Sequence, residues 1–265
     1  MRQPAFYISH GGGPCFWMEF PPPIGPHGFD RLKDFLAGLP ELLPARPSAY
    51  LVISAHWETD GFRFGTSPQP DLIYDYYGFP PHTYELTHPA AGDAELAERA
   101  SSLLTAAGLH AGVDAERGLD HGVFVPFKII DPDAEIPIVP MSIAKGYDPE
   151  LHMAAGRALA PLREEGVAIV ASGSSFHDLK TYFNGQAGIE NRFDDWLTDA
   201  VTADPAQREK LLAKWLEAPG ARASHPKADH LIPLMVAAGA GEGDSATQVY
   251  KDVVAEKQFS GYRFG

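Results

Sequence analysis

The segment Ala49-Tyr50-Leu51-Val52-Ile53-Ser54-Ala55-His56-Trp57 contains an apolar, β-branched run that ends in a histidine beside an indole. A continuous apolar run of this kind is typical of a strand that is buried on both faces of a sheet. An imidazole at the end of such a strand needs a polar partner, because burying an unpaired polar group costs free energy. His56 is therefore the first candidate functional residue.

Two other segments repeat this arrangement. The apolar residues 4–9 lead to His10, and the apolar residues 166–171 lead through a serine-rich turn to His177. Open α/β sheets bind ligands beyond the carboxyl ends of their strands, so we expect these histidines to meet at one edge. The glycines that follow His10, residues 11–13, lack the spacing of a dinucleotide-binding motif. We interpret them as letting the backbone approach a group bound at His10.

Composition and charge restrict the class of protein. The 265 residues are 45% hydrophobic and 21% charged, which is ordinary for a globular protein with a sizeable core. The formal net charge of -14 argues against a nucleic-acid or anionic-membrane surface. Cys15 is the only cysteine, which excludes an intrachain disulfide framework and a cysteine-based zinc module. No apolar run approaches the ~20 residues needed to span a membrane, and no signal peptide is evident, so we expect a soluble, cytoplasmic protein.

Strand-like and helix-like segments alternate along the chain without a linker or a change in composition. This pattern predicts one α/β domain, residues 1–265, with a largely parallel or mixed central sheet flanked by helices and a metal site at the carboxyl edge of its strands. Residues 58–91 are predicted to be irregular, with Asp93 capping the helix that follows. Further strands are expected at 110–114 and 136–143, with a final strand or hairpin from 248–253 and 262–264. Helices are expected at 29–39, 93–107, 148–165 (ended by Gly166), 191–202, 205–217 and 229–238 (ended by Gly239).

Histidine chemistry points to a metal. Neutral imidazole binds Zn(II) or Fe(II), and a catalytic site takes about three protein ligands and leaves a position open. His10 and His56 are the first two candidate ligands, and the third should come from residues 224–233. We favour His230, because it opens an apolar helix that holds it rigidly, and we place His225 beside it as a substrate-contacting neighbour or a helix-start residue. Asp229 is interpreted as the N-cap of that helix.

Two more histidines have alternative roles. His177 is either a fourth metal ligand or a general acid/base, since a histidine titrates near neutrality and suits proton transfer from a phenolic hydroxyl. His121, which follows Asp120, is a candidate for orienting the substrate or an oxygen intermediate. Its structural alternative is an Asp–His hydrogen bond within a turn.

Five motifs occur in one order and spacing along almost the whole chain, from near residue 4 to residue 236. The set resembles the DOPA-dioxygenase type of class III extradiol ring-cleavage enzymes. That resemblance implies a single α/β catalytic domain that binds one Fe(II) or Zn(II) per chain through His10, His56 and His230. It also implies His177 as additional ligand or acid/base, with His121 as a second candidate catalytic acid/base. It also implies a small catechol-type substrate, DOPA-like or another dihydroxyphenyl compound, and O2. The motifs are Ser9-His10-Gly11-Gly12-Gly13-Pro14, Ser54-Ala55-His56-Trp57, Asp120-His121-Gly122, Ala171-Ser172-Gly173 through His177, and Asp229-His230-Leu231-Ile232-Pro233-Leu234.

One departure from the family pattern keeps other functions open. The better-studied class III enzymes use two histidines and a glutamate, and His230 stands here in place of that carboxylate. An all-histidine site also suits zinc, which has no redox chemistry. The alternatives are a zinc-dependent hydrolase or lyase on the same scaffold, or a non-enzymatic zinc-binding protein. We expect no nucleic-acid or membrane partner, and homo-oligomer formation stays an open expectation.

Overall fold

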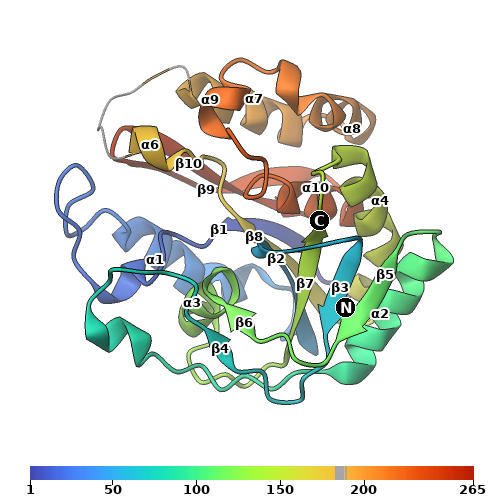
Figure 1. Ribbon diagram of the computed structural model, residues 1–265. Helices are drawn as coiled ribbons and strands as arrows, with labels where there is room; N and C mark the ends of the chain where they lie inside the picture. Colours follow the sequence, from blue (N-terminus) through green and yellow to red (C-terminus); the bar gives the residue numbers. More distant parts are fainter. Residues whose placement is uncertain (183–187, 189) are drawn as a thin grey trace.

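A mixed sheet of eight strands forms the centre of the part of the chain that the structure, a computed structural model, describes: residues 1–182, 188 and 190–265 (Figure 1). The strand order is β5-β3-β7-β2-β8-β1-β10-β9. The four central strands β7, β2, β8 and β1 are mutually parallel, β10 pairs antiparallel with β1 and β9, and β3 pairs antiparallel with β7. The strands are β1 (Ala5–Ser9), β2 (Ala49–Thr59), β3 (Phe62–Gly65), β5 (Ala111–Asp114), β7 (Ile138–Ala144), β8 (Val167–Gly173), β9 (Ala246–Val254) and β10 (Lys257–Phe264), with β4 (Leu72–Ile73) and β6 (Leu119–Asp120) in a separate small sheet.

Helices cover both faces of this sheet (Figure 1). The α-helices are α1 (Asp30–Gly38), α2 (Ala94–Ala106), α3 (His121–Ile130), α4 (Pro149–Leu159), α5 (Pro161–Glu164), α6 (Leu179–Tyr182), α7 (Glu190–Thr202), α8 (Pro205–Ala213), α9 (Ala221–Ser224) and α10 (Pro233–Ala240). Short 3-10 helices are η1 (Cys15–Trp17), η2 (Leu39–Leu42), η3 (Pro81–Tyr84) and η4 (Trp215–Glu217). This architecture confirms the predicted α/β domain.

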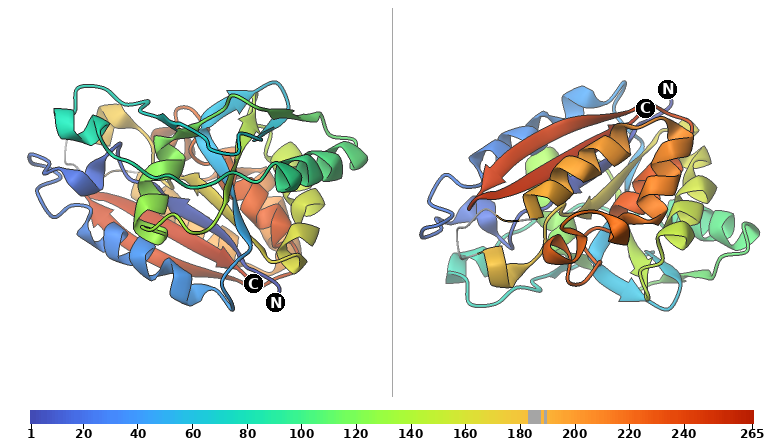
Figure 2. Two further views of the ribbon diagram at one scale, coloured as in Figure 1. Left: turned by 90° about the horizontal axis from the view of Figure 1, so that it is seen from below. Right: turned by 90° about the horizontal axis from the view of Figure 1, so that it is seen from above.

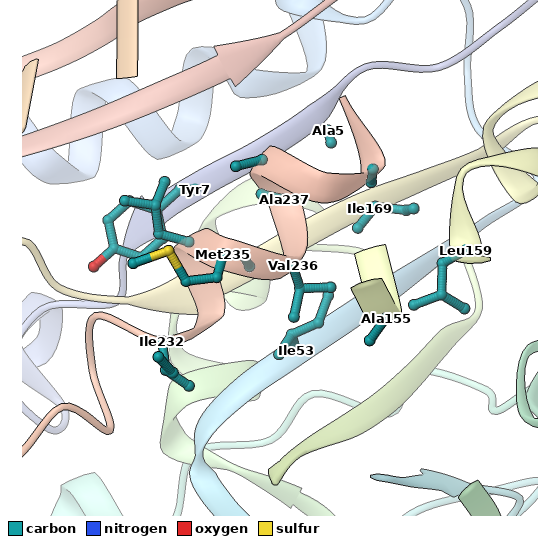
Figure 3. Packing of buried hydrophobic residues seen from close by; sticks show 14 of the residues in the cluster. Ala5, Tyr7, Ile53, Ala155, Leu159, Ile169, Ile232, Met235, Val236 and Ala237 are labelled. Carbon is teal, nitrogen blue, oxygen red and sulfur yellow. The ribbon is translucent and has the colours of Figure 1, made fainter. Parts of the chain in front are cut away.

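Alternation of side chains along the central strands explains their continuous apolar sequence. Tyr7, Ile53 and Ile169 point to the face that α4 and α10 cover, and Figure 3 shows Val236 of α10 packed among them. Their neighbours in sequence, such as Val52, point to the opposite face, which α1 and α3 cover. Because successive residues of a strand face opposite sides, burial of both faces requires every position to be apolar.

Strand β2 contains an irregularity at the position of His56. Ser54 lies opposite Ser142 of β7, and Glu58 lies opposite the next β7 residue, Ile143. Residues 55–57 therefore have no partner in β7, and the strand bends there as at a β-bulge. The bend turns His56 out of the regular alternation toward the carboxyl edge of the sheet.

The two ends of the chain lie side by side, as Figure 2 shows. Ala5 of β1 is the register partner of Phe264 of β10. The fully buried Arg163 joins them, because its Nε donates to the Gln3 carbonyl at 2.7 Å and its guanidinium donates to the Phe264 carbonyl at 3.0 Å. None of the helices within the described residues has the length and apolar character needed to cross a membrane.

Several predicted elements are confirmed. Asp93 caps α2 by accepting a hydrogen bond from the Leu96 amide at 2.9 Å, and Gly166 follows α5 with a φ of 90°. The final hairpin exists as β9 and β10. The segment 58–91 was predicted to be irregular throughout, but its residues Phe62–Gly65 form β3 inside the main sheet.

Other boundaries were predicted wrongly. The helix expected over 148–165 divides into α4 and α5, since Pro161 has no amide hydrogen to continue the first helix. The helix expected over 205–217 divides into α8 and η4. The helix expected over 229–238 begins only at Pro233 and continues through Gly239 to Ala240. His230 therefore precedes this helix and does not open it.

Candidate metal centre

Five histidines meet at the carboxyl edge of the parallel strands. His10 follows β1, His56 lies in the irregular part of β2, and His177 comes after β8, as the strand pattern predicts. His121 is the first residue of α3, and His230 lies shortly before α10. The ring centroids of His10, His56 and His230 are 4.8 to 5.2 Å apart.

The Nε2 atoms of three of these rings face one another. Nε2 of His56 lies 3.2 Å from Nε2 of His10 and 3.2 Å from Nε2 of His230. Nδ1 of His10 lies 3.0 Å from Oγ of Ser172. Because Ser172 donates its own hydroxyl hydrogen to the Gly122 carbonyl, its oxygen accepts from His10. The His10 proton is thus fixed on Nδ1, and its Nε2 carries a lone pair.

Carboxylates stand on the Nδ1 side of the other two rings. Nδ1 of His230 donates to Oδ1 of Asp229 at 2.9 Å, and Nδ1 of His56 lies 3.4 Å from Oδ2 of Asp75. Three Nε2 lone pairs therefore converge, an arrangement that is repulsive by itself and favourable around a cation. Histidine ligands typically donate their second ring nitrogen to a carboxylate, hydroxyl or carbonyl in this manner, so the donor set fits Zn(II) or Fe(II).

Burial keeps the three imidazoles neutral. It lowers the pKa of His10 and the pKa of His230 well below the ordinary histidine value. Burial, followed by the nearby His121, lowers the pKa of His56 to about 3, against the opposing charge of Asp75. Neutral imidazole is the form that binds a metal, so these rings are ready to bind one at neutral pH.

Ring spacing separates these three histidines from their neighbours. Two imidazoles that bind one ion at about 2.1 Å, with angles of about 90–110°, have ring centres about 4.6–5.3 Å apart. The separations of 4.8, 4.9 and 5.2 Å among His10, His56 and His230 fall in this range. The separations of 4.0 Å between His56 and His121 and 3.4 Å between His177 and His230 are too short. Ligand atoms of His10, His56 and His121 nevertheless all lie within 4.8 Å of one another, as do those of His177, Asp229 and His230, so both further rings stand at the site.

His230 is positioned by its backbone. Its carbonyl accepts hydrogen bonds from the Tyr7 hydroxyl at 2.8 Å and from the Ser174 amide at 3.0 Å. A Cβ on Gly173 would lie 2.1 Å from that carbonyl, so only glycine permits this close approach. The rigidity that we expected from a helix is supplied instead by contact with the ends of β1 and β8.

Asp229 was predicted to cap a helix, and the structure corrects this. Its Oδ1 accepts from both the amide and Nδ1 of His230, at 2.8 and 2.9 Å, and its Oδ2 lies 3.2 Å from Nζ of Lys227. The same Oδ1 lies 3.9 Å from Nδ1 of His177. Burial lowers the pKa of His177 although Asp229 opposes the shift, so its ring is predominantly neutral at neutral pH.

Asp75 is a functional residue that sequence reasoning missed. Its Oδ1 accepts from the amide and from Nδ1 of His121, at 2.9 and 2.7 Å, while Oδ2 faces His56. The expected alternative, a bond between His121 and Asp120, does not form: Asp120 pairs with Arg117 and accepts from Oγ of Ser54 at 2.7 Å. The available signal was a lone carboxylate within an aromatic run, residues 74–77.

His225 lies away from the other histidines. It is fully buried, its Nε2 donates to the Ser175 carbonyl at 2.9 Å, and its ring packs on Phe193 and Trp215. Its partners belong to the helical layer, and His225 does not line the cavity among the residues that the structure describes. This packing favours a structural role over contact with substrate.

A cavity of ≈ 360 Å³ opens onto the histidines. His10, His56, His121, His177 and His230 all line it, together with aromatic side chains and the glycines at 11–13. Gly13 has a φ of 56°, and a Cβ there would lie 3.1 Å from the Phe79 ring. The glycine run therefore serves the backbone turn and the packing of the cavity wall. A ring-sized molecule fits this volume beside the three Nε2 atoms.

A family model describing the catalytic LigB subunit of aromatic ring-opening dioxygenase matches residues 4–264. This chain belongs to the LigB family. Membership makes the protein an oxidoreductase of the extradiol ring-opening dioxygenase type, and it confirms the resemblance drawn from the five motifs.

Several relatives of this LigB-family chain are named as dioxygenases. It is 40% identical to "Dioxygenase tasH" of Hapsidospora irregularis, with 94% of this chain and 81% of the relative covered. It is 36% identical to "4,5-DOPA dioxygenase extradiol" of Portulaca grandiflora, with 93% and 90% covered. A crystal structure of an uncharacterised protein from Escherichia coli K12 matches the whole of both chains with a TM-score of 0.79 and 28% identity.

Proposed function

We propose that this chain, as a single catalytic domain over residues 1–265, opens the ring of a small catechol with O2 beside an iron(II) ion held by His10, His56 and His230. The observation that carries the proposal is the convergence of three Nε2 atoms in an open cavity, with those of His10 and His230 each 3.2 Å from that of His56. Bound iron(II) would supply positive charge for the two diol oxygens and the redox chemistry that O2 requires.

His177 is the proposed general base. Its Nδ1 lies on the Asp229 side, which leaves Nε2 for a hydroxyl of the substrate. A neutral ring accepts the phenolic proton, and the Asp229 carboxylate stabilises the imidazolium that results. A positioned base of this kind contributes a factor of about 10²–10⁴ to the rate.

His121 is proposed to orient the substrate. Asp75 holds its Nδ1 proton at 2.7 Å, so its Nε2 is left with a lone pair. Because His121 lines the cavity, this nitrogen is available to accept a hydrogen bond from a diol hydroxyl. Two carboxylate-supported imidazoles thus stand beside the metal ligands, one for proton transfer and one for orientation.

The cavity argues against the non-enzymatic alternative. A structural zinc site is closed by four protein ligands, whereas these three histidines border an open volume. A zinc-dependent hydrolase or lyase would share the open site, and the use of O2 separates it from the proposal.

The test is reconstitution of the metal-free protein with Fe(II) under anaerobic conditions, followed by measurement of O2 uptake with a panel of catechols. We expect uptake coupled to the absorbance of a ring-opened product, and none with the Zn(II)-loaded protein. Absence of uptake with every catechol at full iron occupancy would overturn the proposed activity.

A further inference from the structure

The cavity beside the histidines has an unusual charge distribution. Its wall is largely aromatic and aliphatic, including Phe20, Phe29, Phe79, Phe176, Leu179 and Phe259. Among the described residues, no lysine or arginine lines it. The residues outside the description, 183–187 and 189, contain neither lysine nor arginine in their sequence. The described part of the chain therefore offers no lysine or arginine at this wall for an anionic substituent.

Among the described lining residues, two carboxylates add negative charge. Asp75 is engaged by His121 and His56. Asp178 accepts from the Lys180 amide at 3.0 Å and from the Thr181 hydroxyl at 2.9 Å. These bonds hold both carboxylates in place at the wall, so an anionic substituent entering the cavity meets their repulsion as well as loss of water.

One ammonium group approaches the wall from outside the lining. Nζ of Lys257 lies 5.6 Å from the centroid of the Phe176 ring. The residue is only 1% exposed and does not line the cavity. A molecule in the cavity therefore contacts the Phe176 ring and not the Lys257 ammonium.

One exposed apolar side chain belongs to the cavity lining. Leu179, the first residue of α6, lines the cavity and has 60% of its surface exposed. An apolar side chain left in water at a cavity mouth gains from contact with an apolar group of a ligand.

We propose that this site selects catechols whose ring substituent is apolar and carries no negative charge, and that it disfavours catechols with a carboxylate. This inference rests on the proposed function. It follows from the missing cation: a carboxylate in the cavity loses water and meets no lysine or arginine among the described lining residues, whereas an apolar substituent buries surface against Phe20, Phe176 and Leu179.

A matched pair of substrates tests the preference. Dihydrocaffeic acid and its methyl ester share the catechol ring and the chain length, and they differ in charge. With the Fe(II)-loaded protein we expect kcat/KM to favour the ester by about tenfold or more, the size expected for an unpaired buried polar group. Equal or better turnover of the acid would overturn the inference.

Binding separates this result from failure of the proposed activity. The dissociation constants of acid and ester are measured by calorimetry on the Zn(II)-loaded protein, where no turnover is required. Tighter binding of the ester without any O2 uptake on iron would support the selectivity and reject the activity. Tighter binding of the acid would reject the selectivity, whatever the turnover.

Two lysine variants place a new positive charge either at the cavity or away from it. Leu179→Lys supplies a cation at the mouth, and we expect it to shift the acid-to-ester ratio about tenfold toward the acid. Leu216→Lys is the control, because Leu216 is also a leucine, 48% exposed, in η4 and outside the lining. An equal shift in both variants would show an effect of overall charge and contradict the inference. Thermal unfolding of each variant confirms that the fold is kept.

Discussion

The imidazole ring of His177 lies flat against the ring of His230, with centroids 3.4 Å apart and planes 12° apart. One carboxylate serves both rings, since Oδ1 of Asp229 lies 2.9 Å from Nδ1 of His230 and 3.9 Å from Nδ1 of His177. The candidate ligand and the candidate base are therefore coupled through a single acceptor. Asp229 orients one ring and offers negative charge to the other.

Asp229→Asn is expected to weaken metal binding. The amide oxygen can still accept from His230, but it lacks the charge that raises the basicity of the ring, and loss of such a partner typically costs about 10–100-fold in metal affinity. Competition with a chelator measures the change. Asp195→Asn is the matched control, because the Asp195 side chain is 62% exposed and pairs with Lys251 at the surface. Unchanged metal affinity in Asp229→Asn would contradict the predicted effect of Asp229 on His230.

His56→Ala and His177→Gln should have different consequences. His56→Ala removes one of the three converging nitrogens, so we expect metal stoichiometry to be lost while the circular dichroism spectrum of the fold is retained.

His177→Gln should keep full stoichiometry and lower kcat by about 10²–10⁴, because it removes the base and leaves the three ligands. Metal analysis and O2 uptake are measured on both variants. Loss of metal in His177→Gln would identify His177 as a fourth ligand.

Local pattern was sufficient to predict the central strands and their histidines. The runs that lead toward His10, His56 and His177 are apolar over residues 5–8, 49–53 and 167–171, and parallel pairing then places their carboxyl ends together without further information. The start of α10 was predicted wrongly, because the position of His230 is set by Tyr7 and Ser174, which are distant in sequence.

Asp75 shows the limit of sequence reasoning more clearly. It lies in a long excursion between β3 and α2, and local sequence does not show that this loop folds back over the ends of β1 and β2. Its contact with His121 spans 46 positions of the chain. Contacts of this kind depend on packing between elements, which no periodicity reports.

Stability should fall on the acidic side of neutrality. His152 is fully buried, its Nε2 accepts from the Ala144 amide at 3.1 Å, and its Nδ1 donates to the Asp148 carbonyl at 2.7 Å. Both bonds require the neutral ring, and burial lowers the pKa of His152 to about 4. In the unfolded chain this histidine is protonated below about pH 6.5, whereas in the native protein it is protonated only below about pH 4. Its contribution to the free energy of unfolding is therefore fully present above pH 6.5 and declines as the pH falls through this window.

The size of this decline can be measured. Between pH 7 and pH 5 the contribution of His152 to the free energy of unfolding should fall by about 2 kcal/mol. Urea unfolding at several pH values compares the native sequence with His152→Gln, which should be less stable at pH 7 and lose less on acidification. His27→Gln is the control, because the His27 side chain is 84% exposed. An identical pH slope in His152→Gln and the native sequence would contradict the assignment.

The contact between α4 and α10 should not tolerate a side chain at Gly239. A Cβ on Gly239 would lie 2.1 Å from the Met153 carbonyl, and a Cβ on Gly156 of α4 would lie 2.1 Å from the Val236 carbonyl, so the two backbones touch at reciprocal glycines. Gly239→Ala must separate these helices, and overpacking of this kind costs about 1–3 kcal/mol or more in the free energy of unfolding. Gly243→Ala is the control, because a Cβ on Gly243 would meet no other atom within 4 Å. Because α10 begins three residues after His230, Gly239→Ala should also lower metal affinity. If Gly239→Ala proves as stable as Gly243→Ala, the helices can shift without cost and the prediction is wrong.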